Sequence, residues 1–135
     1  MTTDTVGGVL TYAVTLARAL RRYNVTVVLA AMGGPLNDCW RAQVKALDNV
    51  ICFESAYRLE WMDDPWSDVR QAGKWLGQLA GRFGPDVMHF NNYAHALLDW
   101  ACPTLVVGHS CVCSWHRAVH HRPPSDRWRR YTCTV

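Results

Sequence analysis

The first twenty residues, MTTDTVGGVLTYAVTLARAL (residues 1–20), decide the fold of this chain. Small and apolar side chains recur there at the spacing of one buried helix face, at Val9, Tyr12, Ala13, Leu16, Ala17 and Leu20, which predicts a helix. Gly7 and Gly8 stand directly before it. In α/β proteins such a glycine turn follows the first, usually central, strand. Here only residues 1–3 remain to form that strand.

A glycine turn that leads into a helix can hold an anion, because free backbone N–H groups and the helix dipole point at it. Gly7 and Gly8 are therefore candidate anion-binding residues. The same pair also fits a plain turn from strand to helix that binds nothing.

The rest of the chain alternates short apolar runs with helical patterns, which indicates βαβ units and a parallel sheet. Strands are predicted within residues 25–32, 49–55, 86–92 and 103–110, and helices over residues 38–47, 67–83 and 94–101, with Ser67 as a helix N-cap. The run at residues 25–32 is apolar throughout, as a strand buried on both faces would be. We expect a Rossmann-like α/β fold with about four full strands and a truncated first strand in mid-sheet, flanked by helices on both faces.

Composition narrows the class of protein. A chain of 135 residues with 50% hydrophobic content suits one domain. The net charge of +3 does not indicate a nucleic-acid partner. No apolar run has the roughly 18 residues of a membrane span, and the N-terminus lacks the order of a signal peptide. We therefore expect a cytoplasmic protein.

The six cysteines would form a disulfide framework only in a secreted chain. Cys52 and Cys102 lie in or beside apolar runs, where a reduced cysteine acts as a small buried hydrophobe. We expect all six to be reduced: Cys39, Cys52, Cys102, Cys111, Cys113 and Cys133.

Polar residues cluster where the predicted strands end, and such tips face the ligand crevice of α/β proteins. They are Thr2, Thr3, Asp4, Asn91, Asn92, Tyr93, His109 and Ser110. His109 could also be a purely structural residue, a hydrogen-bonded histidine at the end of a strand. Asp63 and Asp64 fit a turn before a helix better than an acid/base pair.

The C-terminal part of the sequence allows two further functional hypotheses, a zinc site and a site for phosphate or nucleic acid. Cys111, Cys113, His116 and His120 form a C-x-C-x2-H-x3-H string, but C-x-C is tighter than usual zinc spacing, and we expect no metal. The basic run at residues 117–130, with Trp115 and Trp128, could bind phosphate or single-stranded nucleic acid. A solvated face is the commoner role of such a run, and we expect no nucleic acid.

Four stretches together resemble the N-terminal domain of retaining GT-B glycosyltransferases of family four, of the subfamily 4-like type. They are TTDTVGGVLTYAVTLARAL, YRLEWMDDPWSDV, PDVMHFNNYAHA and VVGHSCVCSWHRAV. The resemblance implies transfer of a sugar, of the hexosyl type, from a nucleotide diphosphate sugar to an acceptor with retention of configuration. It places Gly7 and Gly8 near the donor diphosphate and His109 against the transferred sugar or acceptor as the catalytic residue. Crevice-lining roles follow for Asp4, Asn91, Tyr93 and Ser110, and no cofactor is implied.

The chain departs from that family at both ends. The second domain, which binds the nucleotide and holds two glutamates eight positions apart, is missing, and Glu54 and Glu60 are six apart. Most of the first strand is absent, and RWRRYTCTV (residues 127–135) breaks off where the family continues. We expect residues 1–135 to be one acceptor-side domain, incomplete at both ends, marginally stable and inactive alone. The alternative is a stand-alone nucleotide- or sugar-binding module.

Overall fold

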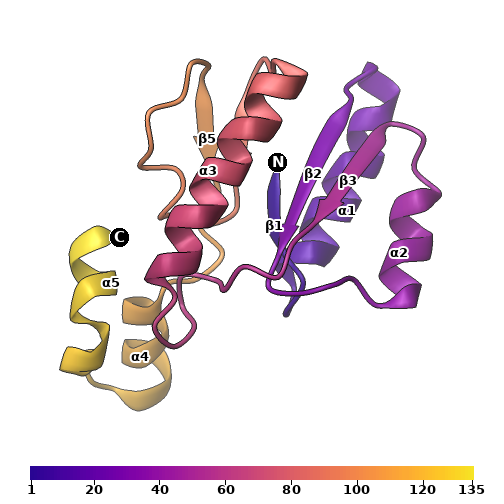
Figure 1. The fold of residues 1–135 in the computed structure, drawn as a ribbon. Helices are drawn as coiled ribbons and strands as arrows, with labels where there is room; N and C mark the ends of the chain where they lie inside the picture. The colour runs from indigo at the N-terminus through magenta and orange to yellow at the C-terminus, as the bar shows by residue number, and fades with distance from the viewer.

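A computed structural model describes residues 1–135 as an α/β fold (Figure 1). The strands are β1 (Thr2–Asp4), β2 (Val27–Met32), β3 (Val50–Glu54), β4 (Met88–Phe90) and β5 (Thr104–Val106). The helices are α1 (Val9–Leu20), α2 (Asp38–Lys45), α3 (Trp66–Phe83), α4 (Val112–His120) and α5 (Arg129–Thr134), with 3-10 turns η1 (Arg21–Tyr23) and η2 (Asp126–Trp128). Strands and helices alternate from β1 to β4, as predicted. None of the helices is both long and apolar enough to cross a membrane.

All strand pairs are parallel, but the strands form two ladders instead of one. The first has the order β1-β2-β3 and the second pairs β4 with β5. β1 therefore lies at the edge of its ladder, whereas the sequence predicted it in mid-sheet. Its neighbour on the open side is β4, which it reaches through side chains: the Asn91 N–H donates to Thr2 Oγ1 at 2.9 Å. β1 and β4 have three residues each, and no backbone ladder joins them.

Helices cover both faces of the three-stranded ladder (Figure 1). On one face, α1 and α2 pack on β2 in a core of Leu10, Ala13, Val14, Ala17, Val27, Leu29, Leu36, Val44 and Leu47. On the other, Leu76 and Leu79 of α3 pack with Ala30 of β2 and with Met88 and Phe90 of β4. β2 is thus buried on both sides, as its continuous apolar run predicted. Because α3 packs on both β2 and β4, it holds the two ladders together.

Two helix predictions need correction. α3 begins at Trp66 with Pro65 as its N-cap, so Ser67 is not the cap. Residues 94–101 form turns, not a helix. There the Ala96 and Leu98 N–H groups bond carbonyls only three residues back, and the Trp100 indole N–H donates to the His95 carbonyl at 2.9 Å. This side-chain bond and the short turns take the place of a helical ladder.

The C-terminal segment, where the sequence pattern weakened, forms the paired helices α4 and α5 near the start of α3 (Figure 1). The Arg127 guanidinium lies 3.2 Å from the Asp63 carboxylate, and the Arg130 guanidinium lies over the Trp66 ring. Part of the basic run is therefore used for internal contacts. The structure places no group of three or more metal-ligating side chains together, and all six cysteines are free.

Candidate functional site at the carboxyl ends of the strands

A small cavity lies at the carboxyl ends of β1, β2, β4 and β5. Its volume is about 60 Å³. Its walls include Thr2, Thr3, Asp4, Val9, Met32, Leu59, Glu60, Trp61, Asn91, Asn92, Tyr93, His109 and Ser110. Parallel strands bring their carboxyl ends to one edge, and the structure brings all eight polar strand-end residues singled out from the sequence to this cavity. They are Thr2, Thr3, Asp4, Asn91, Asn92, Tyr93, His109 and Ser110.

Asn91, just after β4, links β1 to the loop after β5. Its Nδ2 donates to the Thr2 carbonyl at 2.7 Å, so its Oδ1 faces away from β1. That oxygen lies 2.9 Å from His109 Nε2. Since an amide oxygen only accepts, His109 carries its proton on Nε2, and Nδ1 is left as an acceptor for another molecule.

His109 is exposed at the cavity and does not enter the core. Its ring meets the Tyr12 ring of α1 edge-on, with centroids 4.8 Å apart. Tyr12 also contacts His89 of β4, and burial lowers the pKa of His89. The Asn91 bond and the Tyr12 contact together fix the orientation of the His109 imidazole.

Asp4 ends β1 with a half-buried carboxyl group. Its Oδ1 is buried and has no hydrogen-bond partner. Burial raises the pKa of Asp4 to about 6, partly offset by a bond from the Val6 backbone. Near neutral pH this group can accept a hydrogen bond from a ligand hydroxyl, and in its protonated form it can donate one.

Glu60 is a site residue that sequence reasoning missed. Its carboxylate accepts from the backbone N–H groups of Tyr93, at 3.2 Å, and Ala94, at 2.7 Å. Burial raises the pKa of Glu60, which these two bonds oppose. Glu60 thereby positions the loop that carries Asn91 and Tyr93. The signal was present in the sequence as a lone acid between Leu59 and Trp61.

Tyr93 reaches across to the loop after β5. A Cβ atom added at Gly108 would lie 2.5 Å from the Tyr93 hydroxyl oxygen, so only glycine lets the phenol ring lie there. The pKa of the Tyr93 hydroxyl is raised by burial. Next to Gly108, exposed His109 and Ser110 line the cavity.

Gly7 and Gly8 lie beside the cavity, not in its wall. The chain leaves the wall at Asp4 and re-enters it at Val9. Gly7 has a φ of 96°, which favours glycine. Open space surrounds both glycines, and Gly8 is the N-cap of α1 with no side-chain cap. The glycine loop is therefore an uncapped, open helix start at the edge of the site.

The four residues considered above as possible zinc ligands lie in α4 and at its N-cap: Cys111, Cys113, His116 and His120. The Cys111 side chain accepts the Ser114 N–H as the helix cap, and the rings of His116 and His120 are tilted to each other with centroids 5.2 Å apart. Glu54 is likewise structural, since its carboxylate pairs with Arg41 at 3.1 Å.

The sequence pattern of glycosyltransferase family 4 matches residues 6–134 of this chain. No curated protein and no solved structure matches it. The matched span includes the glycine loop, the loop after β4 and His109. Because the match covers nearly the whole chain, the protein belongs to glycosyltransferase family 4.

Proposed function

We propose that this chain is the acceptor-side domain of a retaining glycosyltransferase, which moves a hexosyl group from a nucleotide diphosphate sugar to an acceptor. The observation that carries the proposal is the 2.9 Å bond between Asn91 Oδ1 and His109 Nε2. It holds an exposed imidazole beside a cavity at the strand edge where α/β proteins bind ligands. Membership of glycosyltransferase family 4 supports the class of reaction.

The start of α1 suits the donor diphosphate. Its first N–H groups, at Val9, Leu10 and Thr11, precede the first helical bond, which the Tyr12 N–H makes to the Gly8 carbonyl. No side chain caps the helix and no acidic residue stands in its first turn. These N–H groups and the helix dipole would stabilise the negative charge that grows on the departing diphosphate.

His109 and Asp4 suit hydroxyl groups of the transferred sugar or the acceptor. The free Nδ1 of His109 would accept a hydrogen bond from one hydroxyl group, because the bond to Asn91 fixes the orientation of the ring. Asp4 lines the same cavity, and its unpartnered Oδ1 would offer a second contact. Two fixed contacts orient a sugar better than one, since they restrict its rotation.

We propose that this domain acts only together with a second, nucleotide-binding domain. The cavity of about 60 Å³ is far below the roughly 300–1,000 Å³ of pockets that enclose small ligands. The same comparison disfavours a stand-alone nucleotide- or sugar-binding module at this edge of the sheet, because such a module would need to enclose its ligand there by itself. Without the donor held in place, proximity contributes nothing to the rate.

The test compares the 135-residue chain alone with the same chain joined to the nucleotide-binding domain of a family 4 enzyme. Each is supplied with UDP-, GDP-, ADP- and dTDP-hexoses, and release of nucleoside diphosphate is followed. We expect turnover only from the joined form, with a loss of about 100-fold or more in His109→Ala. His121→Gly is the matched control, because His121 is exposed and its φ of 53° suits glycine.

Equal turnover by the isolated chain would contradict the need for a second domain. Micromolar binding of a nucleotide sugar by the isolated chain, without turnover, would favour the binding module. An unchanged rate of nucleoside diphosphate release in His109→Ala would show that the imidazole does not take part in the transfer.

A further inference from the structure

Two thiols, those of Cys111 and Cys113, lie at the start of α4, directly after the loop that carries His109 and Ser110. Cys111 is the N-cap of the helix and has an extended backbone, with a φ of −124°, and Cys113 is the second residue of the helix. Both thiols are free and only half-buried, so solutes can reach them. The proposed sugar transfer uses neither thiol.

The cap of α4 is unusual because its acceptor is a sulfur atom. Serine, threonine, aspartate and asparagine are preferred at this position. Here Cys111 Sγ accepts the Ser114 N–H at 3.3 Å, and the Ser114 hydroxyl oxygen lies 3.2 Å from the same sulfur. A thiolate accepts hydrogen bonds better than a thiol, and the positive end of the helix dipole favours it too. The cap therefore stabilises the form of Cys111 that acts as a nucleophile.

The acidity of Cys111 agrees with this geometry. Burial alone would raise its pKa, but hydrogen bonds from the side chains and backbones of Ser114 and Cys113 outweigh burial and lower it. Cys52 is a contrast within the same chain, since burial raises its pKa to about 11. Cys133 lies in the last turn of α5, where the helix dipole opposes a negative charge. Of these thiols, Cys111 is held in the most reactive state.

Cys113 lies within disulfide reach of Cys111. Val112, between them, is helical, and Cα atoms two residues apart in a helix are separated by about 5.4 Å. Disulfides join Cα atoms about 4.4–6.8 Å apart. Side chains two positions apart do not face each other in a regular helix, so Cys113 must leave its helical position when the bond forms. The first turn of α4 would then open together with its cap.

We propose that Cys111 and Cys113 are a redox pair, which peroxides oxidise to a disulfide that opens the first turn of α4 and moves the loop of His109. In the first step the Cys111 thiolate attacks one oxygen of hydrogen peroxide. A sulfur–oxygen bond forms, the oxygen–oxygen bond breaks, and the departing hydroxide takes up a proton to become water. Cys111 is then a sulfenic acid.

In the second step the Cys113 thiolate attacks the sulfur of that sulfenic acid. The sulfur–sulfur bond forms and the sulfur–oxygen bond breaks, and the departing hydroxide takes up the proton that the Cys113 thiol has given up. Together the two thiols are oxidised to one disulfide, and one peroxide is reduced to two molecules of water. A dithiol reductant reverses the change.

The disulfide would act on the cavity through the loop after β5. His109 and Ser110 line the cavity and directly precede Cys111 in the chain. The pKa of the Tyr93 hydroxyl is raised by burial and, after it, by the charge of a Cys111 thiolate, so the sulfur lies near that wall of the cavity as well. The chemistry of the two thiols does not depend on the proposed sugar transfer, and each can fail without the other.

The test treats the 135-residue chain with hydrogen peroxide and then digests it with chymotrypsin. Residues 106–115 form a peptide that contains Cys111 and Cys113 and no other cysteine. We expect this peptide to lose the mass of two hydrogen atoms, at least about 10-fold faster than Cys133 is oxidised, and to regain it with dithiothreitol. In the oxidised chain the Ser114 amide should exchange about 10-fold faster, and the His109 ring resonances should shift.

Two serine variants separate the two thiols. Cys113→Ser keeps the attacking thiol but lacks the second one, so Cys111 should gain one oxygen atom as a sulfenic acid that dimedone traps. Cys111→Ser is the matched control, because serine is a preferred N-cap. In this variant peroxide should change neither the exchange of the Ser114 amide nor the His109 resonances.

Oxidation that appears first at exposed Cys39 or Cys133, or a disulfide that joins Cys111 to a cysteine other than Cys113, would overturn the proposal. A peptide of residues 106–115 that keeps its mass under peroxide would do the same. A disulfide that forms without any change at Ser114 and His109 would contradict the link between the pair and the cavity.

Discussion

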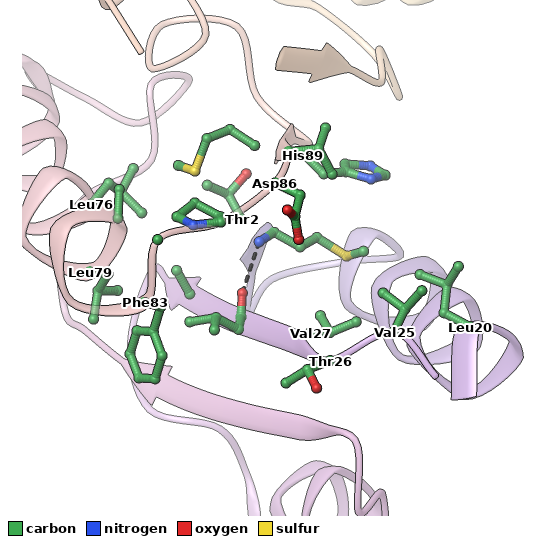
Figure 2. Close-up of a pocket in the computed structure, with 18 of the residues that line it drawn as sticks. Thr2, Leu20, Val25, Thr26, Val27, Leu76, Leu79, Phe83, Asp86 and His89 are labelled. Carbon is green, nitrogen blue, oxygen red and sulfur yellow. Dashed lines mark hydrogen bonds between the residues drawn. The ribbon is translucent and has the colours of Figure 1, made fainter. Parts of the chain in front are cut away.

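The contact between β1 and β4 is held in opposite ways at its two ends. At the carboxyl end of β4, Asn91 donates to Thr2 twice, from its backbone and from its amide, and joins β4 and His109 to β1. At the amino end of β4, only Met1 continues the ladder of β1 with β2, and an apolar groove of about 550 Å³ lies between β2 and β4 (Figure 2). One end is polar and closed by side-chain bonds, and the other is apolar and open.

The difference shows that side-chain hydrogen bonds can hold two parallel strands together where a backbone ladder does not. The Thr2–Asn91 contacts keep the carboxyl edge assembled although β1 and β4 share no ladder. The proposed sugar site therefore depends on a few polar bonds, and the groove end depends on packing by α3 and on the bonds of Met1 to β2.

Phe90→Ala should have the largest effect, because it removes packing common to both ends. Phe90 is fully buried and stacks against Trp100 with centroids 5.3 Å apart. We expect a loss of about 3–5 kcal/mol in the free energy of unfolding, measured with urea. Leu105→Ala in β5, where Leu105 is 50% exposed, should cost less than about 1 kcal/mol. Similar losses in both variants would mean that Phe90 does not anchor β4.

Asn91→Ala should break the carboxyl end selectively. It removes two side-chain bonds, to the Thr2 carbonyl and to His109, each worth about 0.5–1.5 kcal/mol. We expect a loss of about 1–3 kcal/mol and, by ¹⁵N NMR, a mixture of His109 tautomers in place of the Nε2–H form. Gln78→Ala, at an exposed position of α3, should change neither. A His109 spectrum unaltered in Asn91→Ala would disprove the orienting role.

The sequence predicted this carboxyl edge better than the groove end, for a physical reason. Strand tips in a parallel sheet share an edge, so polar residues at the tips, such as Asp4 and His109, could be grouped without knowing any side-chain contact. The continuous apolar run at residues 25–32 likewise required a strand buried on both faces.

What the sequence could not predict depends on contacts between distant residues. Glu60 reaches the site through backbone bonds to Tyr93 and Ala94, and no local pattern specifies them. The turns at residues 94–101 result from the bond between Trp100 and His95, where apolar spacing alone favoured a helix. The division into two ladders likewise depends on how β1 and β4 lie beside each other, joined by Thr2 and Asn91 and not by a backbone ladder.

Asp4→Asn should stabilise the protein in a pH-dependent way. The pKa of Asp4 is raised from 3.8 to about 6, so the folded state disfavours its ionised form. That cost is fully present above about pH 6 and disappears as the pH falls below about 4. After allowance for solvent screening of a half-exposed group, we expect a gain of about 1 kcal/mol at pH 7.5 and none at pH 4.

Thermal melts of Asp4→Asn at the two pH values test this, with Asp99→Asn at an exposed site as the control. An equal gain at both pH values would show that the buried carboxylate is not the cause. Sugar transfer by the joined form should fall in Asp4→Asn, because an amide cannot act as a charged acceptor.

Gly108→Ala should have the smallest effect on stability and a local effect on the site. The added Cβ would lie 2.5 Å from the Tyr93 hydroxyl oxygen, which can swing away at a cost of less than about 1 kcal/mol. We expect a nearly unchanged Tm and a shift of the Tyr93 ring resonances. In Gly108→Ala/Tyr93→Ala the clash is absent, so the His109 resonances should return toward those of Tyr93→Ala alone.

The most direct test of the contrast between the two ends is an amide NMR titration of the joined form with its nucleotide sugar. Binding at the carboxyl edge predicts saturable shifts at Gly8, Val9 and His109, with Val28 and Val87 at the groove unchanged. Shifts confined to Val28 and Val87, with His109 unmoved, would contradict the assignment of the carboxyl edge as the ligand site.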